Sequence, residues 1–141
     1  MQHDVSHNAA NHGLQPYRPK KGEEYMNPAQ EAHFRAILNA WRRELMEEVD
    51  RTVGHMKVDS VHCPDPSDRA TQEADIGIEL RTRDRERKLL NKIDKTLRKI
   101  DDHEYGFCES CGVEIGIQRL EARPTADLCV DCKTREELHE R

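Results

Sequence analysis

Residues 64–70 read Pro-Asp-Pro-Ser-Asp-Arg-Ala, and this short polar stretch separates two long segments with helical periodicity. Pro66 has no amide hydrogen and Pro64 biases its predecessor toward an extended backbone, so no helix runs through the stretch. The same residues can start a new helix, because Asp65 is a good N-cap and Pro66 is favoured at the first helical position. Asp68 complements the positive end of that helix. The stretch therefore predicts the tip of a helical hairpin, with a structural role available to both aspartates.

The segment before this turn has a clear helix start at Asn27. Asn27 is a suitable N-cap, Pro28 follows at the first helical position, and Gln30 stands where a capping box has its glutamine. Apolar residues then recur at spacings of three and four, which places them on one stripe: Phe34, Leu38, Trp41, Leu45, Val49, Val53 and Met56. One apolar stripe on a long polar helix needs a partner helix to cover it.

The segment after the turn supplies that partner. Its apolar residues are Ala70, Ala74, Ile76, Leu80, Leu90, Ile93, Leu97 and Ile100. A short turn between two such helices forces antiparallel packing, and arms of about 36 residues span roughly 54 Å at the helical rise. We therefore expect a mainly α fold, with a long antiparallel coiled-coil hairpin over residues 27–104 that carries its tip at residues 64–70. Because the two stripes satisfy each other within one chain, we expect a monomer.

The charges of the second arm are strongly segregated. Residues 59–79 carry six acidic groups and one basic group, net −5, whereas residues 81–99 carry nine basic and three acidic groups, net +6. The basic stretch interrupts the apolar seam between Leu80 and Leu90. It is either a solvated face with ion pairs three or four residues apart or a surface that binds a partner. The chain as a whole carries −5, which gives no general attraction to polyanions.

Four of the five cysteines form the strongest chemical signal in the chain. Cys108 and Cys111 make one C-x-x-C pair, and Cys129 and Cys132 make another after 17 intervening residues. Two such pairs can hold one tetrahedral Zn²⁺, and a site with four cysteine ligands leaves no position for an activated water. We therefore expect one structural zinc and no catalytic role for it. A redox dithiol is the alternative for either pair. Cys63 has no partner in this pattern.

The zinc site is expected to organise a small globular domain at residues 105–141. Its apolar residues are too few to fold alone, so zinc has to contribute: Val113, Ile115, Ile117, Leu120, Leu128 and Val130. A short closing helix is expected from about residue 130. The cysteine spacing also matches the zinc finger of GATA DNA-binding proteins, but residues 105–141 carry five basic and eight acidic groups, net −3. That charge argues against binding to DNA phosphates.

The first 26 residues show neither helical nor strand periodicity, and we expect a flexible arm that Tyr17 and Tyr25 can dock on the globular part. The chain contains no run of about 20 apolar residues and no signal-peptide core at its start. These features favour a cytoplasmic protein.

Taken together, the tip, the two arms and the cysteines resemble the DksA/TraR zinc-finger family of bacterial transcription factors. The resemblance covers roughly residues 16–135 and lies in residues 22–27, 48–53, 65–70, 83–89, 108–117 and 120–129. It implies a protein that is not an enzyme and that binds RNA polymerase through its secondary channel, without sequence-specific DNA binding. It further implies that the protein acts with the alarmone ppGpp on promoter-complex stability, negatively at promoters for ribosomal RNA and positively at some others.

The resemblance also implies roles for particular residues. Asp65, Asp68 and Ala70 match the tip residues that act on polymerase. Lys92, Arg123 and Lys133 match the family's contacts to ppGpp at the junction with polymerase, with Arg85 and Leu89 as weaker contributors. The transcript cleavage factors GreA and GreB enter the same channel, so a Gre-like factor whose tip carboxylates hold Mg²⁺ is the alternative function. A DNA-binding zinc finger of the GATA type is the third hypothesis.

Overall fold

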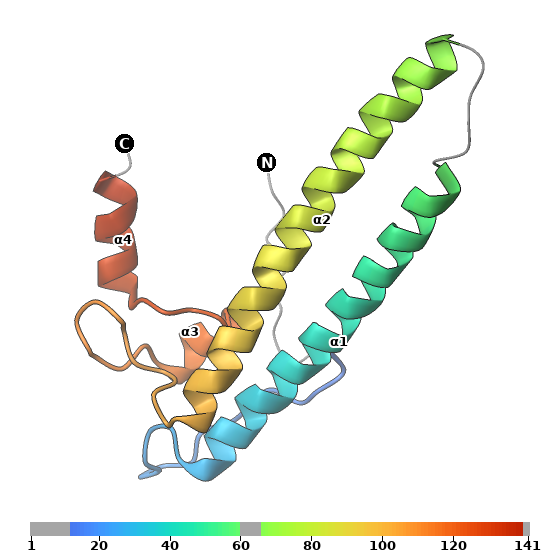
Figure 1. Cartoon of the computed structure of the whole chain (residues 1–141). Helices are drawn as coiled ribbons and strands as arrows, with labels where there is room; N and C mark the ends of the chain where they lie inside the picture. Colours follow the sequence, from blue (N-terminus) through green and yellow to red (C-terminus); the bar gives the residue numbers. More distant parts are fainter. Residues whose placement is uncertain (1–11, 60–65, 140–141) are drawn as a thin grey trace. The chain divides into compact units, whose positions relative to one another are not determined.

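The computed structural model of the chain describes residues 12–59 and 66–139, with side chains described outside residues 52–67. The described part contains the helices α1 (Pro28–Asp59), α2 (Pro66–Asp101), α3 (Ile117–Ala122) and α4 (Val130–His139), shown in Figure 1. The pairing of strands in this part is limited to one isolated bridge between Phe107 and Glu114. The expected mainly α fold class is therefore confirmed. None of the described helices has the length and apolar character needed to cross a membrane.

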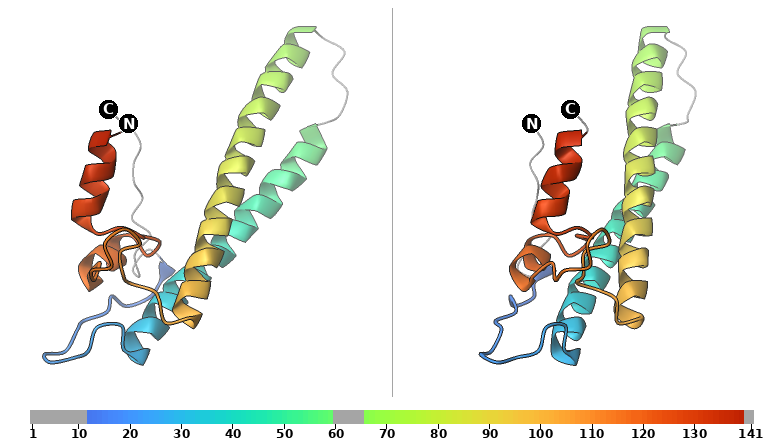
Figure 2. Two further views of the ribbon diagram at one scale, coloured as in Figure 1. Left: turned by 60° about the vertical axis from the view of Figure 1, so that its left-hand side comes forward. Right: turned by 90° about the vertical axis from the view of Figure 1, so that its left-hand side faces the viewer.

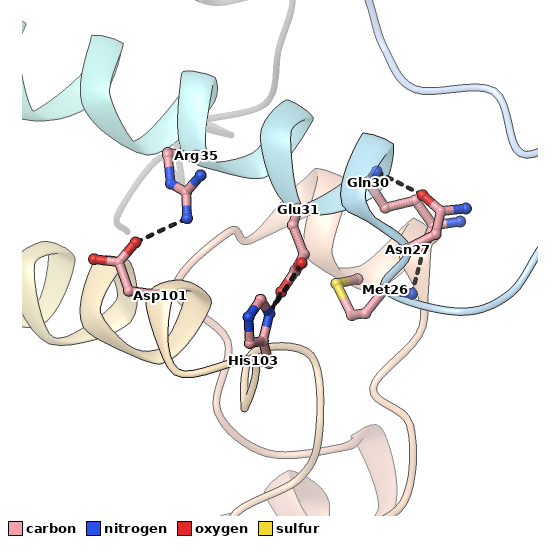
Figure 3. A network of polar contacts seen from close by, with 7 residues as sticks. All are labelled: Met26, Asn27, Gln30, Glu31, Arg35, Asp101 and His103. Atoms are coloured by element: carbon pink, nitrogen blue, oxygen red, sulfur yellow. Dashed lines mark hydrogen bonds and ion pairs between the residues drawn. The ribbon is translucent and has the colours of Figure 1, made fainter.

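The start of α1 follows the predicted cap closely. The Gln30 backbone N–H donates to Asn27 Oδ1 at 2.8 Å, which is the N-cap bond (Figure 3). The Gln30 side chain reaches back, but its Oε1 accepts from the backbone N–H of Met26 at 2.6 Å rather than from that of Asn27. Met26 has a positive φ of 52°, and this left-handed backbone turns its amide toward the helix. The side chains of Asn27 and Gln30 thus each satisfy one backbone N–H at the helix start.

The start of α2 also agrees with the sequence. The helix begins at Pro66, the position at which a proline is favoured, and Asp68 lies exposed in its first turn. Ala70, two residues further on, is also exposed. Asp65, the predicted N-cap, and Cys63 both lie outside the described residues, as does the rest of the turn before Pro66.

The chain divides into two compact units that differ from the three parts expected from the sequence. One unit contains the residues up to Trp41 and those from Ile93 onward, and the other is Arg42–Lys92. In each unit a segment of α1 lies beside an antiparallel segment of α2 (Figures 1 and 2). The arm at residues 1–26, the hairpin at 27–104 and the globular domain at 105–141 remain a prediction about domain organisation.

The first unit contains a core shared by the helices and the segment after them. Its fully buried side chains come from α1, α2 and the C-terminal segment: Phe34, Ile37, Leu38, Ile93, Ile100, Tyr105, Leu120 and Pro124. The rings of Phe34 and Tyr105 lie 5.6 Å apart, and the Tyr105 hydroxyl donates to Pro124 O at 2.7 Å. The predicted stripe omitted Ile37. The buried face of α1 is wider than one coiled-coil seam because it packs on more than a single helix.

Two ion pairs join α1 to the end of α2 within this unit (Figure 3). Arg35 Nη2 lies 2.8 Å from Asp101 Oδ1, and His103 Nδ1 lies 3.1 Å from Glu31 Oε2. Glu31 is buried and Arg35 half-buried, whereas Asp101 and His103 are largely exposed. Exposed pairs contribute little stability, so these contacts align the helix ends more than they hold them together.

The second unit buries less apolar surface than the stripes predict. Leu45 is buried and Val49 half-buried on α1, but Leu80 on α2 is 48% exposed. Ala70 and Ala74 are exposed as well, so the predicted continuation of the seam through these three residues is wrong. Leu80 is followed at once by the charged stretch. Val53 and Met56 lie outside the described side chains.

The charged stretch of α2 contains the local ion pairs that a solvated face predicts. The Asp84 carboxylate forms an ion pair with Arg87 Nη2 at 3.3 Å and another with Lys88 Nζ at 3.2 Å. These partners lie three and four residues further along the helix. Opposite-charge pairs at these spacings support a helix by about 0.2–0.5 kcal/mol each. This stretch therefore stabilises itself as a helix where the apolar seam is absent.

Candidate metal centre

The four cysteines of the two pairs lie together at one point of the first unit. Their sulfur atoms all lie within 4.8 Å of one another, and Cys111 Sγ is 3.7 Å from Cys129 Sγ. Four sulfurs arranged tetrahedrally around Zn²⁺ at ~2.3 Å are separated by about 3.8 Å. The donor set and its spacing thus fit one zinc ion. Cys108, Cys129 and Cys132 are buried, and Cys111 is exposed.

The electrostatic surroundings of the two pairs differ. Burial acts to raise the pKa of Cys108, but backbone hydrogen bonds from Cys129, Cys111 and Ser110 outweigh it and lower that pKa to about 6. Hydrogen bonds with the neighbouring thiols of Cys129 and Cys111 instead raise the pKa of Cys132 to about 12. Backbone N–H groups that point at a sulfur favour the thiolate, which is the form that binds a metal.

The first cysteine pair sits on a short loop closed by backbone hydrogen bonds. Cys108 N–H donates to Val113 O at 2.8 Å, and Gly112 N–H returns to Cys108 O at 2.9 Å. Gly112 has a φ of +79°, so a glycine is needed for this turn. At the base of the loop, Ile115 N–H donates to Gly106 O at 2.8 Å. We call residues 106–116 the knuckle loop.

The second cysteine pair is formed by the start of a helix. Cys129 directly precedes α4, and Cys132 lies in its first turn. The first turn places one backbone N–H near sulfur, since Cys132 N–H points at Cys129 Sγ at 3.5 Å. Lys133 N–H donates to Cys129 O at 2.9 Å and so joins Cys129 to the helix. The short helix expected from about residue 130 is therefore confirmed, and its first turn has a structural function in the site.

A segment from the beginning of the chain contacts this part of the structure. Tyr25 Oη donates to Gly106 O at 2.7 Å and accepts from Gly116 N–H at 3.0 Å. Its ring meets the Phe107 ring edge-on, with 5.6 Å between the centroids. Burial raises the pKa of Tyr25 above its usual 10.0, so the hydroxyl stays a hydrogen-bond donor at neutral pH.

A second contact of the same segment reaches α3. Tyr17 N–H donates to Glu121 Oε1 at 3.0 Å, and the same carboxylate is bound by His33 Nε2 from α1. The Tyr17 and His33 rings lie 5.5 Å apart. The docking expected of Tyr17 and Tyr25 is thus present as hydrogen bonds to the zinc-finger region.

The core of the globular part differs in two residues from the one that the sequence predicts. Val113 and Val130 were expected inside it but are 52% and 58% exposed. Val113 lies at the turn of the knuckle loop and Val130 at the first position of α4, where neither side chain faces the core. Tyr105 and Pro124 are buried in their place.

The comparisons with known proteins agree with this architecture. Residues 30–100 match the N-terminal domain of DnaK suppressor protein DksA, and residues 103–138 match the prokaryotic dksA/traR C4-type zinc finger. The chain belongs to the DksA/TraR family. The second match contains all four clustered cysteines, and the first covers most of the two long helices.

Several members of this family are similar to this chain over most of their length. The RNA polymerase-binding transcription factor DksA of Escherichia coli K12 is 64% identical over 129 residues, which are 92% of this chain and 85% of that protein. The protein of the same name from Haemophilus influenzae is 59% identical, over 92% of this chain and 89% of that protein. The structure of transcription factor DksA2 from Pseudomonas aeruginosa matches with a TM-score of 0.81 and 37% identity, over 88% and 94% of the two chains.

The residues that the family resemblance assigns to an anion lie in different units. Arg123 is exposed and Lys133 half-buried in the first unit, where Lys133 lies 3.6 Å from Glu136. Lys92 is exposed at the end of the second unit. Arg85 is exposed and Leu89 half-buried in that same unit. A shared binding site for these five residues remains a prediction.

The residues that sequence reasoning missed are those that join distant segments. One such contact joins His33 and Glu121, which are 88 positions apart. Another is the close approach of Tyr25 and Met26 to Gly106, where a side chain would not fit. The Tyr25 motif was visible in residues 22–27, but nothing in its spacing indicates the knuckle loop as its partner.

Proposed function

We propose that this protein is a transcription factor that binds RNA polymerase directly and works without sequence-specific DNA binding. The observation that carries the proposal is 64% identity, over 92% of the chain, with a relative named RNA polymerase-binding transcription factor. The proposed mode is entry of the hairpin into the secondary channel, where the tip alters the stability of promoter complexes. Such a role requires the protein to be in the cytoplasm with polymerase, and no chemical step is assigned to it.

The four cysteines are the proposed ligands of one structural zinc: Cys108, Cys111, Cys129 and Cys132. The spacing of the sulfur atoms and the match to a C4-type zinc finger support this assignment. Bound zinc would supply a cross-link between the knuckle loop and the first turn of α4. Four thiolate ligands complete its tetrahedral coordination, so the site would hold structure and would not activate water.

The tip is the proposed regulatory element, with Asp65 and Asp68 as its acidic groups and Ala70 beside them. Asp68 and Ala70 are exposed in the first turns of α2, which leaves them available to a partner. Asn caps a helix about as well as Asp, so a change to Asn removes the charge and keeps the cap.

A purified transcription assay tests the tip. Replacing Asp65 and Asp68 by asparagine together should abolish regulation of a ribosomal RNA promoter while polymerase binding, measured by pull-down, stays within about twofold. Asp75→Asn is the matched control, because Asp75 is an exposed acidic residue of the same helix. Lost binding in the double variant would show that the aspartates are structural. Release of 3′ RNA fragments from backtracked complexes by the wild-type protein would instead support a Gre-like cleavage factor.

We also propose that ppGpp acts through Lys92, Arg123 and Lys133, with Arg85 and Leu89 contributing less. A charged hydrogen bond contributes about 1.5–3 kcal/mol, so each Lys or Arg to Ala change should weaken ppGpp binding to the polymerase complex about tenfold or more. Lys21→Ala provides a control at an exposed lysine outside this group. Binding of labelled ppGpp at equilibrium measures the effect, and unchanged affinity in all three variants would contradict the assignment.

A further inference from the structure

The knuckle loop is held closed at its base by a residue far away in sequence. Its two ends are Gly106 and Gly116, and the single hydroxyl of Tyr25 bonds to both, donating to Gly106 O at 2.7 Å and accepting from Gly116 N–H at 3.0 Å. Gly106 O also accepts from Ile115 N–H at 2.8 Å. The loop cannot open at this end without breaking the bonds to Tyr25.

The backbone of the loop is shaped for this contact. A Cβ at Gly106 would lie 2.9 Å from Met26 Cγ and 2.9 Å from Tyr25 Oη, closer than real side chains come. Gly106 also has a φ of +94°, which other residues rarely adopt. The approach of Met26 and Tyr25 to the loop therefore depends on a glycine at this position.

Both ends of the segment that carries Tyr25 are anchored. At its beginning, Tyr17 N–H donates to Glu121 of α3 at 3.0 Å. At its end, Met26 N–H donates to Gln30 of α1 at 2.6 Å. We call residues 17–27 the strap. Tyr25 is thus held from both sides rather than carried on a loose arm.

We propose that the strap, through Tyr25, keeps the knuckle loop closed and thereby slows the release of zinc. The hydroxyl of Tyr25 bonds to the two glycines at the ends of the loop, so Tyr25 is proposed as a positioning residue. For the ion to leave, Cys108 and Cys111 must separate from Cys129 and Cys132, and Tyr25 resists the opening of the loop that carries the first two. The inference rests on the zinc site of the proposed function and adds to it a control of metal exchange by the N-terminal part of the chain.

The sharpest variant is Tyr25→Phe, which keeps the ring against Phe107 and removes the hydroxyl that bonds to both glycines. Two hydrogen bonds are lost, so we expect zinc to transfer to a chromogenic chelator about tenfold faster. Zinc content at the start should be unchanged, and so should helix content by circular dichroism. Hydrogen exchange at the Gly116 amide, followed by NMR, should quicken by a similar factor because its acceptor is gone.

Tyr17→Phe is the matched control, because it makes the same chemical change but keeps the backbone N–H that anchors the strap on Glu121. The hydroxyl that it removes bonds to Glu23 within the strap. Its zinc release should stay within about twofold of wild type. Gly106→Ala provides a second route, since its Cβ displaces Tyr25 and should quicken release as well. Equal release from Tyr25→Phe and wild type would overturn the inference, and so would equal acceleration by Tyr17→Phe. A wild-type protein without stoichiometric zinc would instead reject the metal assignment itself.

Discussion

Leu120 is the buried residue that α3 contributes to the core. It is fully buried in α3, a helix of six residues that has no side-chain cap at Gly116. So short a helix has little stability of its own and persists because this side chain is packed.

Leu120→Ala should therefore lower the free energy of unfolding by about 2–5 kcal/mol, as a large-to-small change in a core does. Urea denaturation followed by circular dichroism measures the effect. Val113→Ala is the control, since Val113 is more than half exposed and its change should stay within about 0.5 kcal/mol. Similar losses in the two variants would contradict the assignment of Leu120 to the core.

Asn27 gives a second test at the scale of one side chain. Its Oδ1 accepts the N–H of Gln30 at 2.8 Å and satisfies one of the free amides of α1. Asn27→Ala should cost about 1 kcal/mol, whereas Asn27→Ser, which can still cap, should cost clearly less. Thermal unfolding of the two variants measures both costs. Equal stability of Asn27→Ala and Asn27→Ser would contradict a capping role for Asn27.

Among the elements, α2 contains an acidic residue in its basic stretch, Glu86, whose charged form is disfavoured in the folded protein. Burial first, and then the carboxylate of Glu48 on α1, raise the pKa of Glu86 above its usual 4.5. Glu86 Oε2 is buried and has no hydrogen-bond partner among the described residues. The folded state therefore binds a proton at Glu86 more readily than the unfolded state does.

That difference predicts the pH dependence of one substitution. Because the pKa is raised in the folded state, Glu86 costs stability at neutral pH, and the cost disappears as the pH falls through the raised pKa toward 4.5. Glu86→Gln should be more stable than wild type at pH 7 and equal to it well below pH 4.5. Urea midpoints measured at both pH values test this, with Glu73→Gln, an exposed change on the same helix, as the control. An advantage that persists at the lower pH would exclude a charge effect.

The elements themselves were largely predictable. Pro28 and Pro66 start α1 and α2 where the sequence indicates, and α4 begins at the second cysteine pair as expected. The extent of the seam was not predictable at Leu80, because apolar spacing shows which residues share a face but not whether the other helix reaches them. α3 went unpredicted, since its six residues have no periodicity to detect.

At the scale of the molecule, removal of zinc should unfold the short helices α3 and α4 while the long helices α1 and α2 remain folded. α3 and α4 have 6 and 10 residues, against 32 and 36 in α1 and α2. Treatment with a strong zinc chelator should therefore reduce the helical signal at 222 nm by no more than about a fifth. Limited proteolysis should then cut within residues 103–139 while α1 and α2 stay protected. Loss of most of the signal would mean that zinc also supports the long helices.

The sequence alone determined the helix starts, the two cysteine pairs and the segregation of charge, because caps, proline positions and C-x-x-C spacing act through neighbours in the chain. The tertiary structure decided which distant residues meet. Tyr25 bonds to Gly106 and Gly116, 81 and 91 positions away, and His33 meets Glu121 after 88. Such contacts depend on how the chain folds back on itself, and local pattern holds no information about the partner. The cysteine pairs can therefore be read from the sequence, but the contact of Tyr25 with their loop becomes visible only in the folded chain.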